Sequence, residues 1–397
     1  MKITTNNNTV KSAIKKIEKM FDKKQPIEAL KLVKIVSIND DVFLYGGNST
    51  SFIKLKMKDT IVKEEGEVFI DMENFKNLVY TKGNFEIADA EKGLIIKSDK
   101  KKTILSLPQM EDWNVDFFNK QAPDIEQVDN NLMMTIDNPL GFIDDLKLLK
   151  KTVYKDCSAR PIFEGINFNC NEKAGFSTDS YLATHIIMDG FSDNDFNLTI
   201  HYRCVDELSK LIDKATDKIK VFTNNQKVLF VTSQFEYCIK VIDGDFLDWK
   251  QITSSRESVV TMEFNDDKIK SITETLKEYE KIIKPYSDAK SAKVCILKGY
   301  RGGLLSHIHT PVYETTDYIA VTDIKGNVED LIVGVNPSLL NTIFELFKMV
   351  GINATLEYKG RFVPMLLSGG RYSCVICPMV INENVDTNAI VSQYEEQ

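Results

Sequence analysis

The segment Val221–Gly244 reads VFTNNQKVLFVTSQFEYCIKVIDG, in which apolar and polar residues alternate and polar turns separate the alternating runs. Alternation with a period of two is typical of half-buried antiparallel strands. The same layout recurs at Phe85–Pro108 and at Leu356–Met379. These segments start roughly 135 residues apart, which is the length of an ordinary domain, so the sequence predicts a chain of three repeated modules.

Helices are expected at two matching places in each module. One amphipathic helix follows the strand that opens the module, and a second follows a short strand near its middle. The sequence therefore predicts the order β-α-β-β-β-α-β-β-β for each module. This is an α+β fold in which helices cover one face of antiparallel sheets. The short strand and the second helix are expected at residues 67–71 and 72–80, 197–201 and 204–212, and 331–335 and 337–350.

Two linker-like stretches divide the modules. Residues 108–128 are rich in Asp, Asn and Pro, and residues 253–258 read TSSRES. Turn-forming residues gathered in this way favour connections between domains. We therefore expect modules at 1–122, 128–252 and 257–381, followed by an acidic extension at 382–397 that contains no lysine or arginine.

The composition is that of a globular protein with enough apolar residues for several cores. The chain has 397 residues, of which 43% are hydrophobic and 27% charged, and no apolar run approaches the ~20 residues of a membrane-spanning helix. Its first residues are polar, unlike a signal peptide, and its seven cysteines lack a disulfide spacing pattern. We expect a cytoplasmic protein with reduced thiols and no cofactor.

Positive charge gathers on helix faces although the net charge is −8. In the first helix, Lys11, Lys15 and Lys19 form a row opposite an apolar stripe, and lysine rows recur in the first helix of the other two modules. A single helix of this kind is usually a solvated surface with ion pairs. Three matching copies instead favour a basic surface that contacts nucleic-acid phosphates without reading bases.

Four short motifs carry a resemblance to a known family. They read FEGINF at 163–168, STDSYLA at 177–183, DGDFLDW at 243–249 and VICPM at 375–379. In this order and spacing, and with the threefold repeat, they resemble the β sliding clamp of bacterial DNA polymerase III over residues 1–381. The resemblance implies a head-to-tail homodimer that closes a ring around duplex DNA, with helices lining the hole and sheets outside. It also implies a non-catalytic processivity factor.

The family contacts double-stranded DNA through basic residues of the lining helices, without sequence preference and weakly enough to slide. An arginine that is common near position 25 is replaced here by Gln25, so the neighbouring lysines are the expected contacts. The residues that the resemblance implies for this contact are Lys11, Lys15, Lys23, Lys24, Lys150, Lys151, Arg203, Lys277 and Lys281.

The family also docks short peptides that contain glutamine and leucine, in a pocket between its middle and last domains. The expected partners are the DNA polymerase III α subunit, the clamp loader and repair proteins. Apolar anchors inside a polar rim suit this role, and the alternative is that the same residues simply complete two domain cores. The wall that the resemblance implies comprises Phe163, Thr178, Tyr181, Leu182, Leu247, Ile252, Val375, Cys377, Pro378, Met379 and Ile381.

This chain departs from the family pattern around that pocket. Tyr181 and Leu182 stand where His and Arg are usual, and Gln251 and Val380 replace common arginines. The extension after residue 381 is also unusual for the family. It is expected to be a disordered acidic tail, or alternatively a segment that folds back across the pocket.

Ring closure is expected to join an outer strand of the first module to one of the third module in a second copy. Helix and strand faces of this kind are more often ordinary core. The candidates are Phe75, Leu78, Ile104 and Leu105 on one side, and Ile269, Ile272 and the strand at residues 293–297 on the other.

Catalytic and metal-binding interpretations have less support. The sequence contains only four histidines and no phosphate-binding glycine loop, GxSxG motif or HExxH motif. Cys374 and Cys377 point to opposite faces of a strand, so no metal site is expected. Asp266 and Asp267 are the best carboxylate cluster for a metal-dependent DNA-processing enzyme, but their position just before a helix favours an N-cap. A further alternative is a monomeric interaction scaffold of the same fold.

Overall fold

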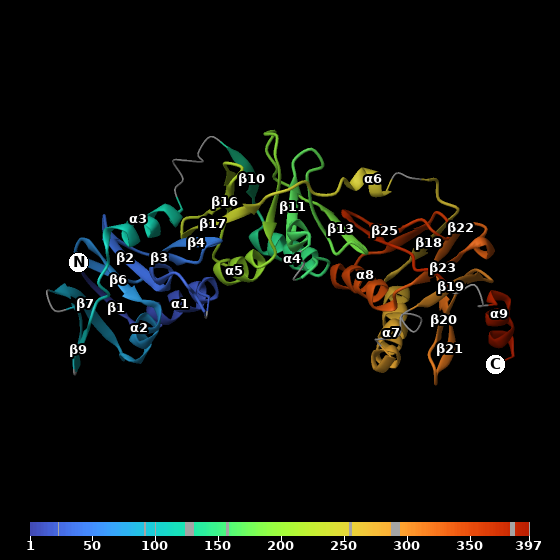
Figure 1. Cartoon of the computed structure of the whole chain (residues 1–397), viewed down its shortest axis with the longest axis horizontal. Helices are drawn as coiled ribbons and strands as arrows, with labels where there is room; N and C mark the ends of the chain where they lie inside the picture. The colour runs from blue at the N-terminus through green and yellow to red at the C-terminus, as the bar shows by residue number, and fades with distance from the viewer. Residues whose placement is uncertain are drawn as a thin grey trace. The chain divides into compact units, whose positions relative to one another are not determined.

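The computed structural model describes residues 1–22, 24–90, 93–99, 101–123, 131–155, 159–253, 256–286, 294–381 and 386–396. The predicted site residue Lys23 and the start of the predicted strand at 293–297 lie outside these ranges. The described residues form helices and antiparallel strands (Figure 1), which confirms the predicted α+β fold. None of the described helices is both long and apolar enough to cross a membrane.

The chain divides into two compact units. The first comprises Met1–Lys147, Asn167–Lys173 and Asp189–Gly244, and the second comprises Leu148–Ile166, Ala174–Met188 and Asp245–Gln397. Residues of the predicted middle module therefore belong to both units.

The first third of the chain forms two sheets. One sheet has the strand order β5-β1-β7-β8-β9, and the other contains β6, β2, β3 and β4 in that order. The elements are β1 (Lys2–Asn6), α1 (Asn7–Ile17), β2 (Leu32–Ile38), β3 (Asp41–Gly47), β4 (Ser51–Lys56), β5 (Ile61–Glu64), β6 (Gly66–Asp71), α2 (Met72–Asn77), β7 (Asn84–Ala90), β8 (Gly93–Ser98), β9 (Lys101–Leu105) and α3 (Asp112–Gln121).

Among the described residues, each third has more strands between its two predicted helices than the three expected: five in the first third, five in the last third, and four in the middle third. In the middle third, β11 to β14 separate the two helices, and the last of them is the short strand directly ahead of the second helix. The elements are β10 (Leu132–Ile136), α4 (Pro139–Lys150), β11 (Gly165–Asn169), β12 (Ala174–Thr178), β13 (Leu182–Ile187), β14 (Asn197–His201), α5 (Cys204–Leu211), β15 (Ile219–Thr223), β16 (Lys227–Val231), β17 (Phe235–Ile242) and α6 (Trp249–Thr253).

The last third contains a separate four-stranded sheet with the order β21-β20-β19-β23. Its elements are β18 (Val260–Phe264), α7 (Asp266–Ile283), β19 (Cys295–Tyr300), β20 (Gly303–His309), β21 (Glu314–Ala320), β22 (Asp323–Gly326), β23 (Ile332–Val335), α8 (Pro337–Val350), β24 (Ala354–Tyr358), β25 (Met365–Gly369), β26 (Tyr372–Ile376) and α9 (Thr387–Glu395).

Strands from different thirds pair with each other inside each unit. In the first unit β4 pairs antiparallel with β17, with Ser51 opposite Ile239. In the second unit β13 pairs antiparallel with β26, with Leu182 opposite Ile376. Main-chain hydrogen bonds therefore join the first third to the middle third and the middle third to the last third, and at each junction the strands of two thirds form one continuous sheet.

The first helices of the first and last thirds have the predicted apolar stripes. In α1, Val10, Ala13, Ile14 and Ile17 are buried, and Asn6 caps the helix by accepting a hydrogen bond from the Thr9 N–H at 3.0 Å. The corresponding stripe of α7 is also buried and comprises Ile269, Ile272, Leu276, Tyr279 and Ile283.

Two details of the helix predictions are wrong. The N-cap of α7 is Asn265, which accepts from the Lys268 N–H at 3.1 Å, while Asp266 and Asp267 lie in the first turn, where the helix dipole favours acidic residues. In α4, the spacing of the apolar residues in the sequence favours Leu140 on the buried face, but Leu140 is 43% exposed. Phe142 of the same helix is buried, with its ring 6.4 Å from the Phe230 ring.

The described part of the C-terminal extension is a helix, so the predicted disordered tail is wrong for these residues. Asp386 caps α9 by accepting from the Asn388 N–H at 2.9 Å. Ile390 packs in a cluster with Ile296, Tyr300, Leu305 and Ile381 on the four-stranded sheet of the last third (Figure 1). Burial of this apolar face stabilises a segment that is too short and too polar to form a stable helix by itself.

Candidate nucleic-acid and peptide interfaces

The first unit carries predicted basic residues on α1 and α5, two helices that contact each other. Lys11 and Lys15 are exposed on α1 opposite its buried stripe. Arg203 is exposed at the N-terminus of α5, and the exposed Lys24 follows the helical turn Glu18–Met20. The apolar residues of these helices face the core, so the charged ends of the basic side chains point to solvent and can contact a polyanion.

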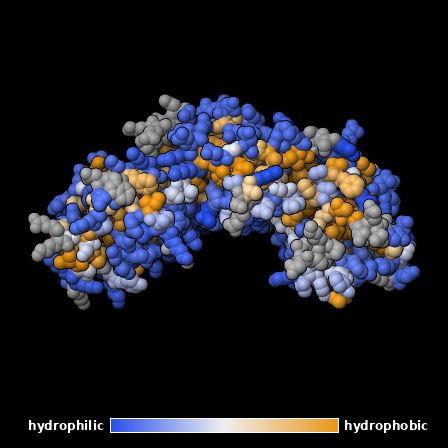
Figure 2. Space-filling view, viewed as in Figure 1, coloured by the Kyte–Doolittle hydropathy of each residue, from blue (hydrophilic) through white to orange (hydrophobic). Residues whose placement is uncertain are grey.

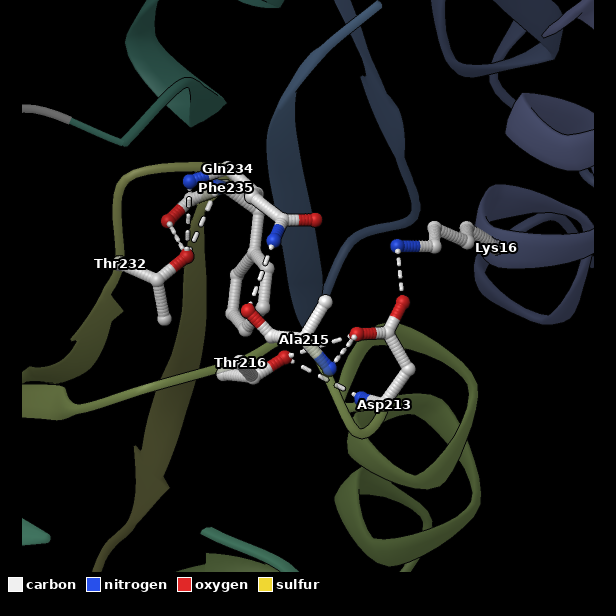
Figure 3. Close-up of polar contacts among 7 residues, drawn as sticks. All are labelled: Lys16, Asp213, Ala215, Thr216, Thr232, Gln234 and Phe235. Carbon is white, nitrogen blue, oxygen red and sulfur yellow. Dashed lines mark hydrogen bonds and ion pairs between the residues drawn. The ribbon is translucent and has the colours of Figure 1, made fainter. Parts of the chain in front are cut away.

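Lys16 has a different role from its neighbour Lys15. Its Nζ lies 3.1 Å from Asp213 Oδ2, in the loop after α5 (Figure 3). Asp213 also accepts from the Ala215 N–H at 3.0 Å, and Gln234 Nε2 donates to the Ala215 carbonyl at 3.3 Å. Burial alone would raise the pKa of Asp213, but the hydrogen bond and charge of Lys16 outweigh burial and lower it. This contact ties α1 to the middle third.

The second unit gathers lysines around one carboxylate. Lys277 Nζ of α7 lies 2.6 Å from Glu345 Oε1 of α8. The hydrogen bond from Lys277, followed by the charges of Lys277, Lys348 and Lys151, lowers the pKa of Glu345 despite partial burial. The structure thus brings the predicted Lys151 and Lys277 together and adds Lys348, which the sequence analysis missed because its neighbours on α8 are apolar. Part of the positive charge of this group is neutralised by Glu345.

The two other predicted basic residues of the second unit lie on α7 and at the end of α4. Lys281 is exposed on α7, one turn after Lys277. Lys150, the last residue of α4, is half-buried. The spacing of four residues keeps Lys277 and Lys281 on one face of α7, as the sequence predicts.

Part of the predicted peptide pocket forms an aromatic cluster in the second unit. Phe176, Ala183 and Val375 are buried together, with Phe246, Trp249, Ile252 and Leu366 packed against them. The ring of Phe163 lies 6.0 Å from that of Phe246, so the predicted Phe163, Ile252 and Val375 border one cluster. Phe176, Phe246 and Trp249 were not predicted, although two of them lie in the DGDFLDW motif as an apolar pair at helical spacing.

The turn between β12 and β13 presents Tyr181 to solvent. The Asp179 carboxylate accepts from the Tyr181 N–H at 2.8 Å and from the Leu182 N–H at 2.6 Å. Burial raises the pKa of Asp179, and these two hydrogen bonds oppose that rise. The turn is completed by Thr178, whose hydroxyl donates to the Leu182 carbonyl at 2.9 Å. Tyr181 is 63% exposed as a result, whereas Leu182 is buried.

The remaining residues of the predicted pocket wall lie beside this turn or pack outside the Phe176 cluster. The Cys377 N–H donates to the Tyr181 carbonyl at 2.8 Å, and the Met379 N–H donates to the Gly334 carbonyl at 2.7 Å. Cys377, Pro378 and Met379 are half-buried, and Leu247 is 40% exposed. Ile381 is buried in the separate cluster beneath α9, and so it packs away from the Phe176 cluster.

Apolar side chains reach the surface in this region. Figure 2 shows hydrophobic atoms at the surface in the part of the view where Figure 1 labels β13 and β25. The exposed large apolar residues of the second unit include Tyr181, Leu247, Phe362 and Val380. Exposed apolar residues near a buried aromatic cluster are typical of a protein-binding surface.

Most residues predicted for the subunit interface are inside cores. Phe75, Leu78, Ile269 and Ile272 are each at most 2% exposed, so they offer no side-chain surface to a second copy. Ile104, on β9, is 52% exposed, and Leu105 is half-buried. The strand predicted at 293–297 corresponds to β19, which pairs with both β20 and β23. The strands at the two edges of that sheet are β21 and β23.

Metal-ligating residues do not gather among the described residues, where no group of three His, Cys, Asp or Glu side chains could hold an ion. Burial raises the pKa of the Cys374 thiol to about 12, so this thiol is protonated at neutral pH. His307 Nδ1 lies 2.9 Å from Thr316 Oγ1. Its Nε2 faces Glu314, which also faces His309.

Comparisons with known proteins agree with this architecture. No family model matches the chain. The β sliding clamp of Streptococcus pneumoniae serotype 4 is 22% identical over 355 residues, which are 84% of this chain and 87% of that protein. The solved structure of the Bacillus subtilis sliding clamp has a TM-score of 0.81 and 17% identity, and covers 96% of this chain and 100% of that one.

A third similar protein is a β clamp of Helicobacter pylori, solved bound to a DNA ligase peptide. It has a TM-score of 0.74 and 18% identity, and covers 96% of this chain and 100% of that chain. The resemblance expected from the sequence is therefore confirmed: this chain has the fold of the bacterial sliding clamps, the β subunits of DNA polymerase III, and is similar to them in sequence over most of its length.

Proposed function

We propose that this protein is a DNA sliding clamp, a non-catalytic processivity factor in which two copies join head to tail around duplex DNA. The observation that carries the proposal is the division of charge on α1 and α7. Each helix buries an apolar stripe and keeps lysines exposed on the opposite side. In a chain with the sliding-clamp fold, such faces suit contact with phosphates.

The contact with DNA would be weak and independent of base sequence. The exposed lysines of α1 and α7 provide scattered positive charges with no arrangement that reads base edges, and Lys277 is partly neutralised by Glu345. A ring that is topologically linked to DNA needs little affinity, and weak phosphate contacts allow it to slide. The residues proposed for this contact are Lys11, Lys15, Lys24, Lys151, Arg203, Lys277 and Lys281, with Lys348 added.

The surface around Tyr181 is proposed as the docking site for short peptides of replication and repair proteins, including the polymerase and the clamp loader. Support comes from the H. pylori clamp of the same fold, which was solved with a DNA ligase peptide. In this chain, the exposed Tyr181 and Leu247 lie near a buried aromatic cluster. An apolar anchor of the peptide could pack there while its polar residues remain at the rim.

Ring closure is proposed through the edge strands β9 and β21. Among the described strands, β9 pairs only with β8 and β21 only with β20. An unpaired strand edge readily accepts another strand. Antiparallel pairing of β9 in one copy with β21 in the other would therefore continue a sheet from one chain to the next.

The experiment that tests the clamp function compares retention on circular and linear DNA. The protein would be loaded by its cognate clamp loader onto nicked circular DNA at moderate salt, separated from free protein by gel filtration, and divided into two samples. We expect it to remain on the circle and to leave after the circle is cut once, because only topological linkage depends on closed ends. Equal retention on both forms would contradict the proposal.

Two alternatives predict other results. A monomeric scaffold would sediment with the mass of one chain, 45.2 kDa, whereas the clamp would sediment near twice that mass. A metal-dependent DNA-processing enzyme would cleave or modify DNA when magnesium or manganese is added. We expect no such activity.

A further inference from the structure

The C-terminal helix α9 covers the face of the sheet β21-β20-β19-β23 that lies opposite α7. The Tyr279 hydroxyl of α7 is 2.9 Å from Ser306 Oγ and donates to Asp317 at 2.7 Å. Because side chains alternate along a strand, the neighbouring Leu305 and Tyr318 point to the other face. These two residues are directly opposite each other in the β20–β21 pair. Leu305 belongs to the cluster that contains Ile390 of α9.

The last turn of α9 is fixed beside the edge strand β21. The ring of Tyr394 lies 6.3 Å from that of Tyr318 on β21, with an angle of 28° between the planes. Glu395 is held by the Tyr300 hydroxyl at 2.8 Å and by Arg301 Nη2 at 2.6 Å. Tyr318 remains 40% exposed. Glu396, the C-cap residue of α9, is exposed directly after this turn. We call Tyr318 of β21 together with Tyr394 and Glu396 of α9 the aromatic and acidic margin of this sheet.

A row of basic and apolar side chains, complementary to that margin, lies on the edge strand β9 and its neighbour β8 in the first unit. Leu94 and Ile96 of β8 are buried beneath the sheet, so Ile95 and Lys97 point outward. Lys97 is directly opposite Lys102 in the β8–β9 pair, and Ile95 is opposite Ile104. Lys97 and Lys102 are exposed, and Ile104 is 52% exposed. The outer side of this edge is thus basic and apolar.

We propose that α9 is part of the subunit interface, and that its margin receives the row Lys97, Lys102 and Ile104 of a second copy. This inference rests on the proposed homodimer, in which β9 pairs with β21. Pairing of β9 with β21 would form one sheet across the two copies, with the outward-facing residues of both strands on the same side. Ile104 would then contact Tyr318 and Tyr394, and the two lysines would contact Glu396. The C-terminal extension would then add contacts that the strand edges alone cannot make.

Charge identifies the second copy as the occupant of this margin. The extension has acidic residues and no lysine or arginine, whereas Lys97, Lys101 and Lys102 give the β8–β9 hairpin an excess of positive charge. Opposite charges across an interface favour one partner and orientation over others. An acidic peptide would be repelled by the same margin.

The test measures the dissociation constant of the dimer by sedimentation in the full-length protein. We expect Lys102→Glu to weaken the dimer about five-fold and Glu396→Lys to weaken it by a similar factor, as is typical of pairs at the rim of an interface. The variant that carries both substitutions should recover most of the affinity, because the pair is restored with reversed signs. Asp193→Lys, at an exposed position in the middle third, is the matched control and should leave the constant unchanged.

The outcomes separate this inference from the proposed function. A wild-type protein that remains a monomer would overturn the homodimer and the role of α9 together. A wild-type dimer whose constant is unchanged by both single substitutions, or weakened by them without recovery in the double variant, would overturn only the role of α9. Circular dichroism of each variant checks that α9 and the sheets remain folded.

Discussion

Lys16 Nζ lies 3.1 Å from Asp213 Oδ2, although the two residues are 197 positions apart in the sequence. The ion pair joins α1 of the first third to the loop that follows α5 of the middle third, in the same unit in which β4 pairs with β17. The side chain of Lys16 is 17% exposed and that of Asp213 is 44% exposed. Water therefore screens the pair in part.

Removal of this pair should weaken the first unit slightly. We expect Lys16→Met and Asp213→Asn each to lower the free energy of unfolding by roughly 0.5–1 kcal/mol, since partly exposed ion pairs contribute little. Urea unfolding of both single variants and the double variant gives the coupling energy, which should decrease at high salt. Lys11→Met is the matched control on the exposed face of α1. Fully additive effects would show that the two residues do not stabilise each other.

Glu207 should make the stability of the first unit depend on pH. The Tyr237 hydroxyl donates to its buried carboxyl group at 2.5 Å. Burial raises the pKa of Glu207 from 4.5 to about 7, opposed by the hydrogen bonds from Tyr237 and Ser51. The folded chain therefore holds a proton that the unfolded chain has released. Ionisation of Glu207 therefore destabilises the folded chain. Its protonated form contributes its full stabilisation below about pH 4.5, and this contribution is lost as the pH rises to about 7.

The magnitude follows from the size of this pKa difference. We expect the free energy of unfolding of the wild type to fall relative to that of Glu207→Gln by on the order of 3 kcal/mol between these pH values. Denaturant titrations of both proteins at half-unit pH steps provide the measurement. A constant difference across the range would show that Glu207 titrates normally.

Neutralisation of Glu345 should strengthen DNA binding. Its carboxylate engages Lys277 and lies within the field of Lys151 and Lys348. Glu345→Gln releases Lys277 to contact phosphates, and we expect roughly a three-fold gain in affinity for short duplex DNA at low salt, with a steeper dependence on salt. Fluorescence anisotropy with labelled duplex measures both quantities.

The matched control for this substitution is Glu278→Gln, which removes the same charge from an exposed position on α7. A gain limited to Glu345→Gln identifies release of Lys277 as the cause. Equal gains in both variants would indicate that only the net charge matters.

Tyr181 should contribute to peptide binding without contributing to stability. It is 63% exposed on a turn that is held by backbone hydrogen bonds to Asp179. We expect Tyr181→Ala to weaken binding of a glutamine- and leucine-containing clamp-binding peptide about ten-fold, as is typical of an exposed aromatic anchor. The melting temperature should stay the same. Tyr80→Ala, at a residue that is 80% exposed in the first unit, serves as the control in the same calorimetric titration.

A contrasting substitution in the buried part of the cluster distinguishes binding from folding. Val375 is 3% exposed and packs against Phe176 and Ala183. Val375→Ala should lower the free energy of unfolding by roughly 1–3 kcal/mol. If Tyr181→Ala also lowers the melting temperature, Tyr181 has a structural role that its exposure does not indicate.

The helical stripes could be predicted because they follow from local periodicity. In α1 and α7, the residues expected on the apolar side are buried, and the lysines Lys11, Lys15, Lys277 and Lys281 lie on the exposed side. A helix that packs on a sheet must bury one stripe, so spacing alone identifies it. The repeat of strand segments was likewise visible from alternation.

Features that depend on distant partners could not be predicted in this way. Ile381 lies only two residues after the VICPM motif, but it packs beneath α9. Met379, at the end of that motif, already forms a bridge with Gly334 of β23. Likewise, Phe75 and Ile269 looked like candidates for an interface, since a sequence does not distinguish an apolar face that is covered by its own sheet from one that is covered by a second copy. The role of Glu345 required knowledge of how α7 and α8 pack.

The ladders formed by β4 with β17 and by β13 with β26 limit how the repeated thirds can be rearranged. In a middle third produced as a separate fragment, β17 would lack its partner β4 and β13 would lack its partner β26. The fragment would therefore have two strand edges with unpaired main-chain hydrogen-bonding groups. Such a fragment would tend to stack with copies of itself into insoluble material. Exchange of a single third between related proteins would therefore succeed only when the strands that flank it are exchanged as well.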